Sequence, residues 1–349
     1  MIPNRNSDHR MSLSTEEKAH IREQVCALEL FILKAILAER EQIHPSALCA
    51  ISEVTAADTI YAIDRVAESA IETWFDEHWD ANWPIEVIME GLEDDASLTF
   101  PRGTAVEATK LKCIIDPIDG TRGIMYDKRA AWILIGIAPQ RGAANTIADI
   151  EVAVMTEIPT TRQWRADQLS ATKHGGIQTI AFDIRNDFYA TRVALSASDA
   201  AEVNHAFGTV CRFFPAGSVL LSQVEDTLWE RLYGTPETPS PTVFNDQYIS
   251  TGGQFYEILS GHDRFIADLR PEAFRKIGLS TNNLTAHPYD VATALLLTEA
   301  GCIVEKPNGE ALDYPLDCTT PVSWVAYANQ ALAEGIRPTL QTVMSELLD

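Results

Sequence analysis

The order of hydrophobic and polar residues predicts two long helices near the start of the chain. Ser14 or Thr15, followed by Glu16 and Glu17, has the form of a helix N-terminus with a capping hydroxyl and acidic first turn. Apolar residues then recur at helical spacing as far as Arg40. They are Ile21, Val25, Leu28, Ile32 and Ile36. The same spacing predicts a second helix over residues 56–80.

From Ile85 the pattern changes to short apolar runs that end in turn residues. Strands are predicted at residues 85–89, 111–115, 131–138 and 148–158, and their continuous apolar character favours a sheet covered on both faces. Further along, the pattern predicts a strand at 191–198, a helix at 216–232, a loop at 234–246, a helix at 290–300, and a strand at 302–306 with a turn at 307–310. This alternation indicates a layered α/β fold.

The same pattern divides the chain into segments. Residues 1–14 are polar and are expected to be disordered. An N-terminal α+β half is predicted over 15–190 and a C-terminal α/β half over 191–349.

Composition restricts the partners. The 349 residues carry a formal net charge of −23, which disfavours a nucleic-acid polymer or an anionic membrane as the binding partner. If the protein binds a phosphate, bound divalent cations are the obvious source of positive charge. No apolar run is long enough to span a membrane and the N-terminus lacks a signal-peptide core, so a cytoplasmic protein is expected. The six cysteines are scattered without a CxxC pair, which favours buried free thiols over metal or disulfide chemistry.

Two aspartates follow an apolar strand in the sequence DPIDGT, residues 116–121. Ligand sites in α/β folds lie at the ends of strands. The carboxylates of Asp116 and Asp119, with the carbonyl of Ile118 between them, could therefore converge on one hard cation such as Mg²⁺. The alternative is a solvated acidic turn.

Three further acidic residues stand at positions where they could join this site. Glu90 closes the apolar run 85–89, Asp64 lies beside apolar residues of the second predicted helix, and Asp290 begins the helix predicted at 290–300. Each has a simple structural alternative, such as the helix cap for Asp290. Three other chemistries are disfavoured, because the sequence has no D-x-D pair of the haloacid-dehalogenase type, no G-x-S-x-G motif and no Walker motif.

DPIDGT at 116–121 and YDVATALLLTEAG at 289–301 together resemble the two signatures of the inositol monophosphatase superfamily of metal-dependent phosphatases. In the second signature Tyr289 replaces a tryptophan and Cys302 replaces the final glycine, whereas Asp290, Ala300 and Gly301 match. The superfamily also includes bisphosphate nucleotidases and fructose bisphosphatases. The resemblance implies the inositol monophosphatase/sugar phosphatase fold, with alternating layers of helices and sheets.

The resemblance also implies roles for individual residues. Mg²⁺ would be held by Glu90, Asp116, the carbonyl of Ile118, Asp119 and Asp290. Thr121, hydrogen-bonded to Asp64, would act with Glu90 on the attacking water. The residues expected to bind the substrate are Gly120, Thr121, Gly217, Ser218 and Glu257. A homodimer and inhibition by lithium are further expectations.

The expected activity is the hydrolysis of a small phosphorylated polyol or sugar. DGTRG at 119–123 is closer to bisphosphate nucleotidases, so a 3′(2′),5′-bisphosphate nucleotidase is an alternative, with Arg122 either near a second phosphate or simply exposed. A catalytically silent relative with a regulatory role is the alternative from another class, because the neighbours of Glu90 and Asp64 depart from the family pattern. His287 could contact substrate or be structural.

Overall fold

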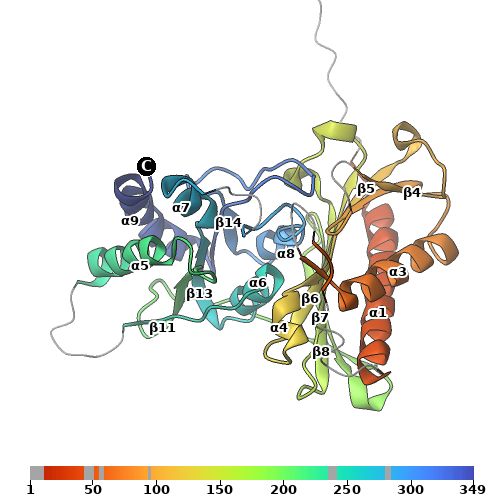
Figure 1. The fold of residues 1–349 in the computed structure, drawn as a ribbon, viewed down its shortest axis with the longest axis horizontal. Coiled ribbons are helices and arrows are strands. Elements are labelled where there is room, and N and C mark those ends of the chain that lie inside the picture. Colours follow the sequence, from red (N-terminus) through yellow and green to blue (C-terminus); the bar gives the residue numbers. More distant parts are fainter. Residues whose placement is uncertain (1–11, 43–50, 55–58, 93–95, 235–241, 280–283) are drawn as a thin grey trace, which may run out of the picture.

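Helices and sheets alternate in five layers in the computed structural model (Figure 1). The model describes residues 12–42, 51–54, 59–92, 96–234, 242–279 and 284–349. Helices α1 and α3 cover one face of a large sheet, α6 and α8 lie between this sheet and a smaller one, and α5 and α9 cover the far side of the smaller sheet. The predicted layered α/β fold is confirmed.

The outer layer on the N-terminal side is formed by α1 (Thr15–Gln42) and α3 (Ala62–Glu77). The start of α1 is a reciprocal cap, in which the Glu17 N–H donates to the Ser14 hydroxyl and the Ser14 N–H donates to the Glu17 carboxylate. The five apolar residues predicted to share a face of α1 are all fully buried against the sheet.

The large sheet has the strand order β10-β9-β8-β7-β6-β5-β3-β4. Its strands are β3 (Ile85–Met89), β4 (Leu98–Phe100), β5 (Leu111–Asp119), β6 (Ala131–Pro139), β7 (Val152–Ile158), β8 (Arg165–Thr172), β9 (Ile177–Asp183) and β10 (Tyr189–Val193). The central strands are apolar on both faces because α1 and α3 cover one face while α6 and α8 cover the other. In this sheet β3 and β5 run parallel, whereas the other paired strands are antiparallel.

The smaller sheet has the order β12-β11-β13-β15-β14. Its strands are β11 (Ala206–Val210), β12 (Val243–Phe244), β13 (Asp263–Asp268), β14 (Ile303–Glu305) and β15 (Trp324–Tyr327). The helices around it are α5 (Ser218–Tyr233), α6 (Thr251–Leu259), α7 (Arg270–Lys276), α8 (Ala294–Glu299) and α9 (Gln330–Leu347). As in the large sheet, a parallel pair occurs beside antiparallel ones: β13 runs parallel to β11 and antiparallel to β15.

Several predicted elements differ from the structure. The helix predicted at 56–80 begins only at Ala62, because residues 59–61 form β2 (Thr59–Tyr61), which pairs with β1 (Ile51–Val54). Residues 55–58 lie outside the described part. The strand predicted at 191–198 does not open the second half: Thr191–Val193 are the end of the edge strand β10.

Other differences concern the termini and the second motif. Of the stretch 1–14 predicted to be disordered, residues 12–14 are described, and the Leu13 N–H donates to Glu151. In the loop predicted at 234–246, residues 235–241 lie outside the described part and Val243–Phe244 form β12. The helix predicted from Asp290 begins at Ala294, because residues 289–293 form successive tight turns with hydrogen bonds from residue i+3 to residue i.

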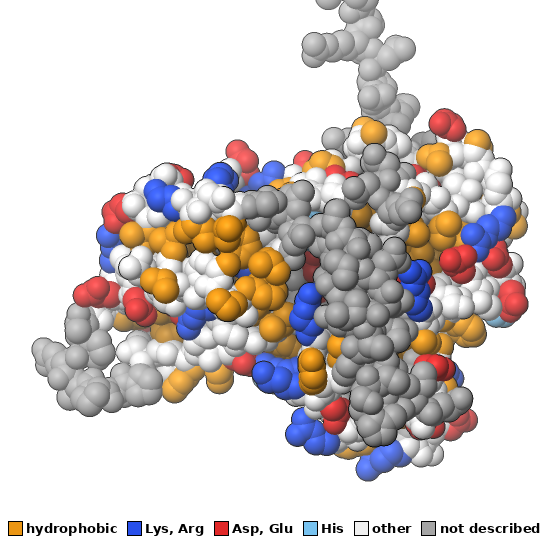
Figure 2. All heavy atoms as spheres, viewed as in Figure 1, with side chains coloured by type: hydrophobic (Ala, Val, Ile, Leu, Met, Phe, Trp, Pro, Cys, Tyr) orange, Lys and Arg blue, Asp and Glu red, His pale blue; other side chains and the backbone are white. Residues whose placement is uncertain are grey.

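The surface carries both positively and negatively charged side chains. On the face in Figure 2, Lys and Arg side chains lie among the acidic ones, and hydrophobic side chains gather over the C-terminal half. Among the described residues, no helix combines the length and apolar character that crossing a bilayer requires.

The large sheet and the second motif approach so closely that Gly136 of β6 has no room for a side chain. An added Cβ would lie 2.7 Å from Ile150 Cδ1 and 2.9 Å from the carbonyl oxygen of Ala292. We expect Gly136→Ala to lower the free energy of unfolding by about 1–3 kcal/mol in urea titrations, since overpacking forces the backbone apart. Gly335→Ala, at an exposed position of α9 with nothing within 4 Å of the added Cβ, should instead raise it by up to about 1 kcal/mol. If Gly136→Ala unfolds at the same urea concentration as wild type, the close packing described here is contradicted.

Candidate functional site

A β-bulge explains why the two aspartates of DPIDGT are separated by two residues. Successive side chains of a regular strand alternate between faces, so Asp116 and Asp119 would point in opposite directions. In β5, however, Asp116 pairs with Leu134 and Asp119 pairs with Trp132, so three steps on β5 match two steps on β6. The extra residue turns both carboxylates to the same face. Pro117 fits inside the bulge because it has no N–H to contribute to the ladder.

Local hydrogen bonds fix the geometry of this turn. The Ile118 N–H donates to Asp116 Oδ1 (3.0 Å), and the Thr121 hydroxyl donates to the Ile118 carbonyl (2.7 Å). Gly120 has φ +94°, and a Cβ there would lie 3.0 Å from Ile249 O and from Ser250 Cβ. Glycine is therefore required both by the backbone conformation and by the close approach of the chain before α6.

Three carboxylates from the two signatures meet at this point. Asp116, Asp119 and Asp290 each offer one oxygen, and these oxygens all lie within 4.8 Å of one another. Asp290 arrives in the turn before α8, where its Oδ2 accepts the His287 N–H at 2.7 Å. Glu90 follows β3, lines the same pocket and forms a side-chain hydrogen bond with Asp116. Residues about 170 positions apart are thus brought to one cluster.

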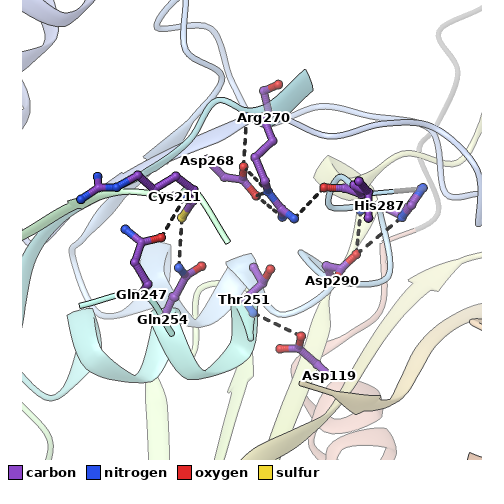
Figure 3. Close-up of polar contacts among 12 residues, drawn as sticks. Asp119, Cys211, Gln247, Thr251, Gln254, Asp268, Arg270, His287 and Asp290 are labelled. Carbon is purple, nitrogen blue, oxygen red and sulfur yellow. Dashed lines mark hydrogen bonds and ion pairs between the residues drawn. The ribbon is translucent and has the colours of Figure 1, made fainter. Parts of the chain in front are cut away.

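Asp119 is held by the first turn of α6. The Ser250 hydroxyl (2.8 Å) and the Gly252 N–H (2.6 Å) donate to Oδ2, and the Thr251 N–H (3.2 Å) donates to Oδ1 (Figure 3 shows the Thr251 contact). Ser250 is also the N-cap of α6 and accepts the Gly253 N–H. The helix N-terminus therefore stabilises the charged form of Asp119.

Burial raises the pKa of Asp116, Asp119 and Asp290, and repulsion by neighbouring carboxylates adds to the shift of Asp116 and Asp290. Burial is the main cause for Asp116, followed by the charges of Asp119 and Asp290, and its pKa lies well above the usual range. Burial and the charge of Asp119 raise the pKa of Asp290 in the same way. For Asp119, burial raises the pKa to about 6, although the bonds from Gly252, Ser250 and Thr251 oppose the shift. A divalent cation would remove this repulsion, so the donor set fits a metal ion with oxygen ligands.

The pocket around the acids includes seven of the predicted site residues: Glu90, Asp116, Ile118, Asp119, Gly120, Thr121 and Asp290. Asp64 lies in the first turn of α3, with its Oδ1 3.5 Å from the Thr121 hydroxyl, so the predicted pair is close but the shorter bond of Thr121 goes to Ile118. His287 also lines the pocket; it is buried, and its Nδ1 lies 3.1 Å from the Tyr289 hydroxyl.

Three predicted substrate residues do not line the pocket. Gly217 and Ser218 begin a helix as expected, but that helix is α5, on the far side of the smaller sheet. Glu257 lies six residues into α6, about 9 Å along the axis from its pocket end at a rise of 1.5 Å per residue. Its carboxylate contacts His262 Nδ1 at 2.6 Å instead.

Two polar residues that line the pocket were not predicted from the sequence. Ser250 and Thr251, at the start of α6, are the small polar residues that face the pocket. The sequence S-T-G-G at 250–253 contains the signal, since a serine before small residues is a typical N-cap. Phe213, Phe214 and Arg270 also line the pocket, and none of them belongs to either motif.

Comparison with known proteins finds solved structures of similar fold. No family model and no curated protein matches the chain. Solved structures do match: a fructose-1,6-bisphosphatase of Leishmania major has 12% identity and a TM-score of 0.68, over 95% of this chain and 96% of its own. The extragenic suppressor protein SuhB of Bartonella henselae has 15% identity and a TM-score of 0.61, over 92% and 98%. An IMPase of Thermotoga maritima has 14% identity and a TM-score of 0.56, over 93% and 99%.

The chain has the inositol monophosphatase fold. The resemblance predicted from its two motifs is confirmed at this level, because the matches extend over nearly the whole length of both chains. At these identities the likeness shows the fold alone, so the argument for function depends on the acids and their surroundings.

The raised pKa values predict how the metal-free protein responds to pH. Asp119 has a folded pKa of about 6 against an ordinary value of 3.8, so the folded state binds more protons between these values and stability falls as pH rises through that window. The shifts of Asp116 and Asp290 act in the same direction at higher pH.

In metal-free buffer at pH 7.5, we expect Asp116→Asn to unfold at a higher temperature than wild type, with a smaller difference at pH 5. Mg²⁺ should stabilise wild type more than Asp116→Asn. Equal melting curves at both pH values would contradict the repulsion.

A second prediction concerns the clamp on Asp119. Ser250→Ala removes one hydrogen bond to the carboxylate and the N-cap of α6, so we expect about 0.5–2 kcal/mol of destabilisation and roughly 10- to 100-fold weaker Mg²⁺ binding in calorimetry. Asn329→Ala, which removes the N-cap of α9, is the matched control and should lower stability without changing Mg²⁺ affinity. Unaltered Mg²⁺ affinity in Ser250→Ala would show that the clamp has no part in metal binding.

Proposed function

We propose that the protein is a Mg²⁺-dependent phosphomonoesterase that hydrolyses a small phosphorylated polyol or sugar. The observation that carries the proposal is the cluster of Asp116, Asp119 and Asp290, with three oxygens within 4.8 Å of one another in a pocket at strand ends. The fold supports it, because the matching structures include a fructose-1,6-bisphosphatase and an IMPase. The presence of the complete acid set favours an enzyme over a catalytically silent relative.

The residues of the chain supply the binding site for the cation and the phosphate. Asp116, Asp119, Asp290, Glu90 and the carbonyl of Ile118 would hold Mg²⁺, which when bound would neutralise phosphate charge and acidify the attacking water. The acids alone would repel a phosphate. The hydrogen bonds from the start of α6 hold Asp119 in place, and the bulge keeps Asp116 beside it, so the ligands are arranged before the cation arrives.

Thr121 is placed to handle the proton of the water. Its hydroxyl donates to the Ile118 carbonyl at 2.7 Å and lies 3.5 Å from Asp64 Oδ1. If a cation took the Ile118 carbonyl as a ligand, Asp64 would be the other acceptor within reach of the Thr121 hydroxyl. The Thr121 oxygen can then accept a proton from water while its own proton passes to Asp64. The water oxygen bonds to phosphorus as the bond from phosphorus to the alcohol oxygen breaks, and the departing oxygen takes up a proton from solvent.

The test is phosphate release from a panel of inositol phosphates, sugar phosphates and adenosine 3′,5′-bisphosphate, with and without Mg²⁺. Asp116→Asn should abolish turnover while the far-UV spectrum stays the same. Thr121→Ala should lower kcat by about 10²- to 10⁴-fold, whereas Thr121→Ser retains the hydroxyl and should keep most of the activity. Near-normal turnover by folded Asp116→Asn would refute the proposal, and release from the adenosine compound alone would select the nucleotidase.

A further inference from the structure

The wall of the pocket that does not carry the acids is formed by the smaller sheet. The parallel strands β11 and β13 both end at the pocket, as β3 and β5 do from the large sheet. Phe213 and Phe214 follow β11, and Arg270 follows β13. The two parallel pairs thus deliver different chemistry to one pocket: carboxylates from the large sheet, and a guanidinium with two aromatic rings from the smaller one.

Arg270 is held rigidly before any ligand binds. Its Nε donates to both oxygens of Asp268 (2.8 and 3.0 Å), Nη2 donates to Asp268 Oδ2, and Nη1 donates to the Leu284 carbonyl (2.7 Å). The guanidinium carbon lies 4.8 Å from the Phe213 ring centre and 5.8 Å from that of Phe214. Arg270 is 7% exposed. Such a fixed fork loses little conformational entropy when it binds an anion.

The orientation of this ion pair leaves donors for a ligand. A guanidinium has five N–H groups, and the bonds to Asp268 and Leu284 use three of them. One N–H on Nη1 and one on Nη2 have no acceptor among the described residues. Arg270 lines the pocket whereas Asp268 does not, so the carboxylate lies behind the guanidinium. Figure 3 shows the guanidinium between Asp268 and the loop that carries His287 and Asp290.

Arg270 also lies close enough to the acids for one substrate to reach both. It lines the same pocket as Asp119 and Asp290. The ester phosphate of a substrate belongs with the acids and their cation, so the alcohol part must extend towards the opposite wall. There it would meet two N–H donors of a positively charged group, which suit an anion better than a neutral hydroxyl.

We propose that Arg270 binds a second anionic group of the substrate, so that the enzyme prefers a doubly anionic compound, a bisphosphate or a phosphorylated sugar acid, over a neutral polyol monophosphate. This inference rests on the proposed phosphatase function and specifies its substrate class. The geometry assigns Arg270 a role in selectivity, and its simple alternative is an ion pair that only ties β13 to the segment at Leu284.

The experiment compares two matched pairs of substrates. Fructose 1,6-bisphosphate against fructose 1-phosphate tests a second phosphate, and 6-phosphogluconate against sorbitol 6-phosphate tests a carboxylate. For wild type we expect kcat/KM to be at least tenfold higher for the doubly anionic member of one pair, mainly through KM. Calorimetry measures the affinity of the same compounds independently of turnover.

The variants avoid leaving a buried charge alone. Asp268→Asn/Arg270→Gln removes both charges of the pair and should bring the kcat/KM ratio and the affinity ratio to about one, while Arg270→Lys should keep an intermediate preference. Glu305→Gln/Arg337→Gln removes an ion pair of the same two-bond geometry between β14 and α9, and should leave both ratios unchanged.

The outcomes separate the two proposals. Equal kcat/KM and affinity within both pairs for wild type, or an unchanged preference in folded Asp268→Asn/Arg270→Gln, would overturn the role of Arg270. A wild type that releases no phosphate from any compound would overturn the phosphatase, and the affinity ratios would still decide whether Arg270 binds the second anion.

Discussion

Electrostatic repulsion among buried carboxylates is the constraint on which the rest of the site depends. Asp116 and Asp119 are buried and Asp290 is partly buried, and the three present oxygens within 4.8 Å of one another where charge is poorly solvated. Evolution of a stable fold alone would not gather them, since apolar residues of similar size would pack there without cost. The arrangement becomes favourable once a divalent cation is present, so cation binding is coupled to the stability of this part of the fold.

The repulsion is contained by packing from both halves of the chain. β5 supplies Asp116 and Asp119, the turn before α8 supplies Asp290, and the start of α6 holds Asp119 from the other side. At Gly252 an added Cβ would lie 2.5 Å from Leu134 of β6 and 3.1 Å from Asp119 Oδ2 of β5. Helix α6 therefore packs against these strands with no room for a further atom. The acids therefore remain together because the surrounding core fixes the backbone on which they stand.

The sequence predicted the acids but not everything that places them. Glu90, Asp116, Asp119 and Asp290 were found because each stands at the end of an apolar run or in a motif of fixed spacing, which are local properties. The bulge in β5 depends on its pairing with β6 and is not visible in the run itself. The position of Glu257 depends on α6, which sets it six residues beyond the end of the helix that lines the pocket. Arg270 belongs to neither of the two motifs, and only the fold brings it to the pocket of the acids.

The two sheets meet at the pocket in the same manner but with opposite chemistry. Each contributes a parallel pair of strands whose carboxyl ends face it, β3 with β5 and β11 with β13. Strand ends are free of ladder constraints, so their side chains can change while the sheets remain intact. The acids at the ends of β3 and β5 are required by any substrate of a metal-dependent phosphatase. With the proposed substrate bound, residues after β11 and β13 would contact the part that differs between compounds, and it is there that this chain places a fixed guanidinium.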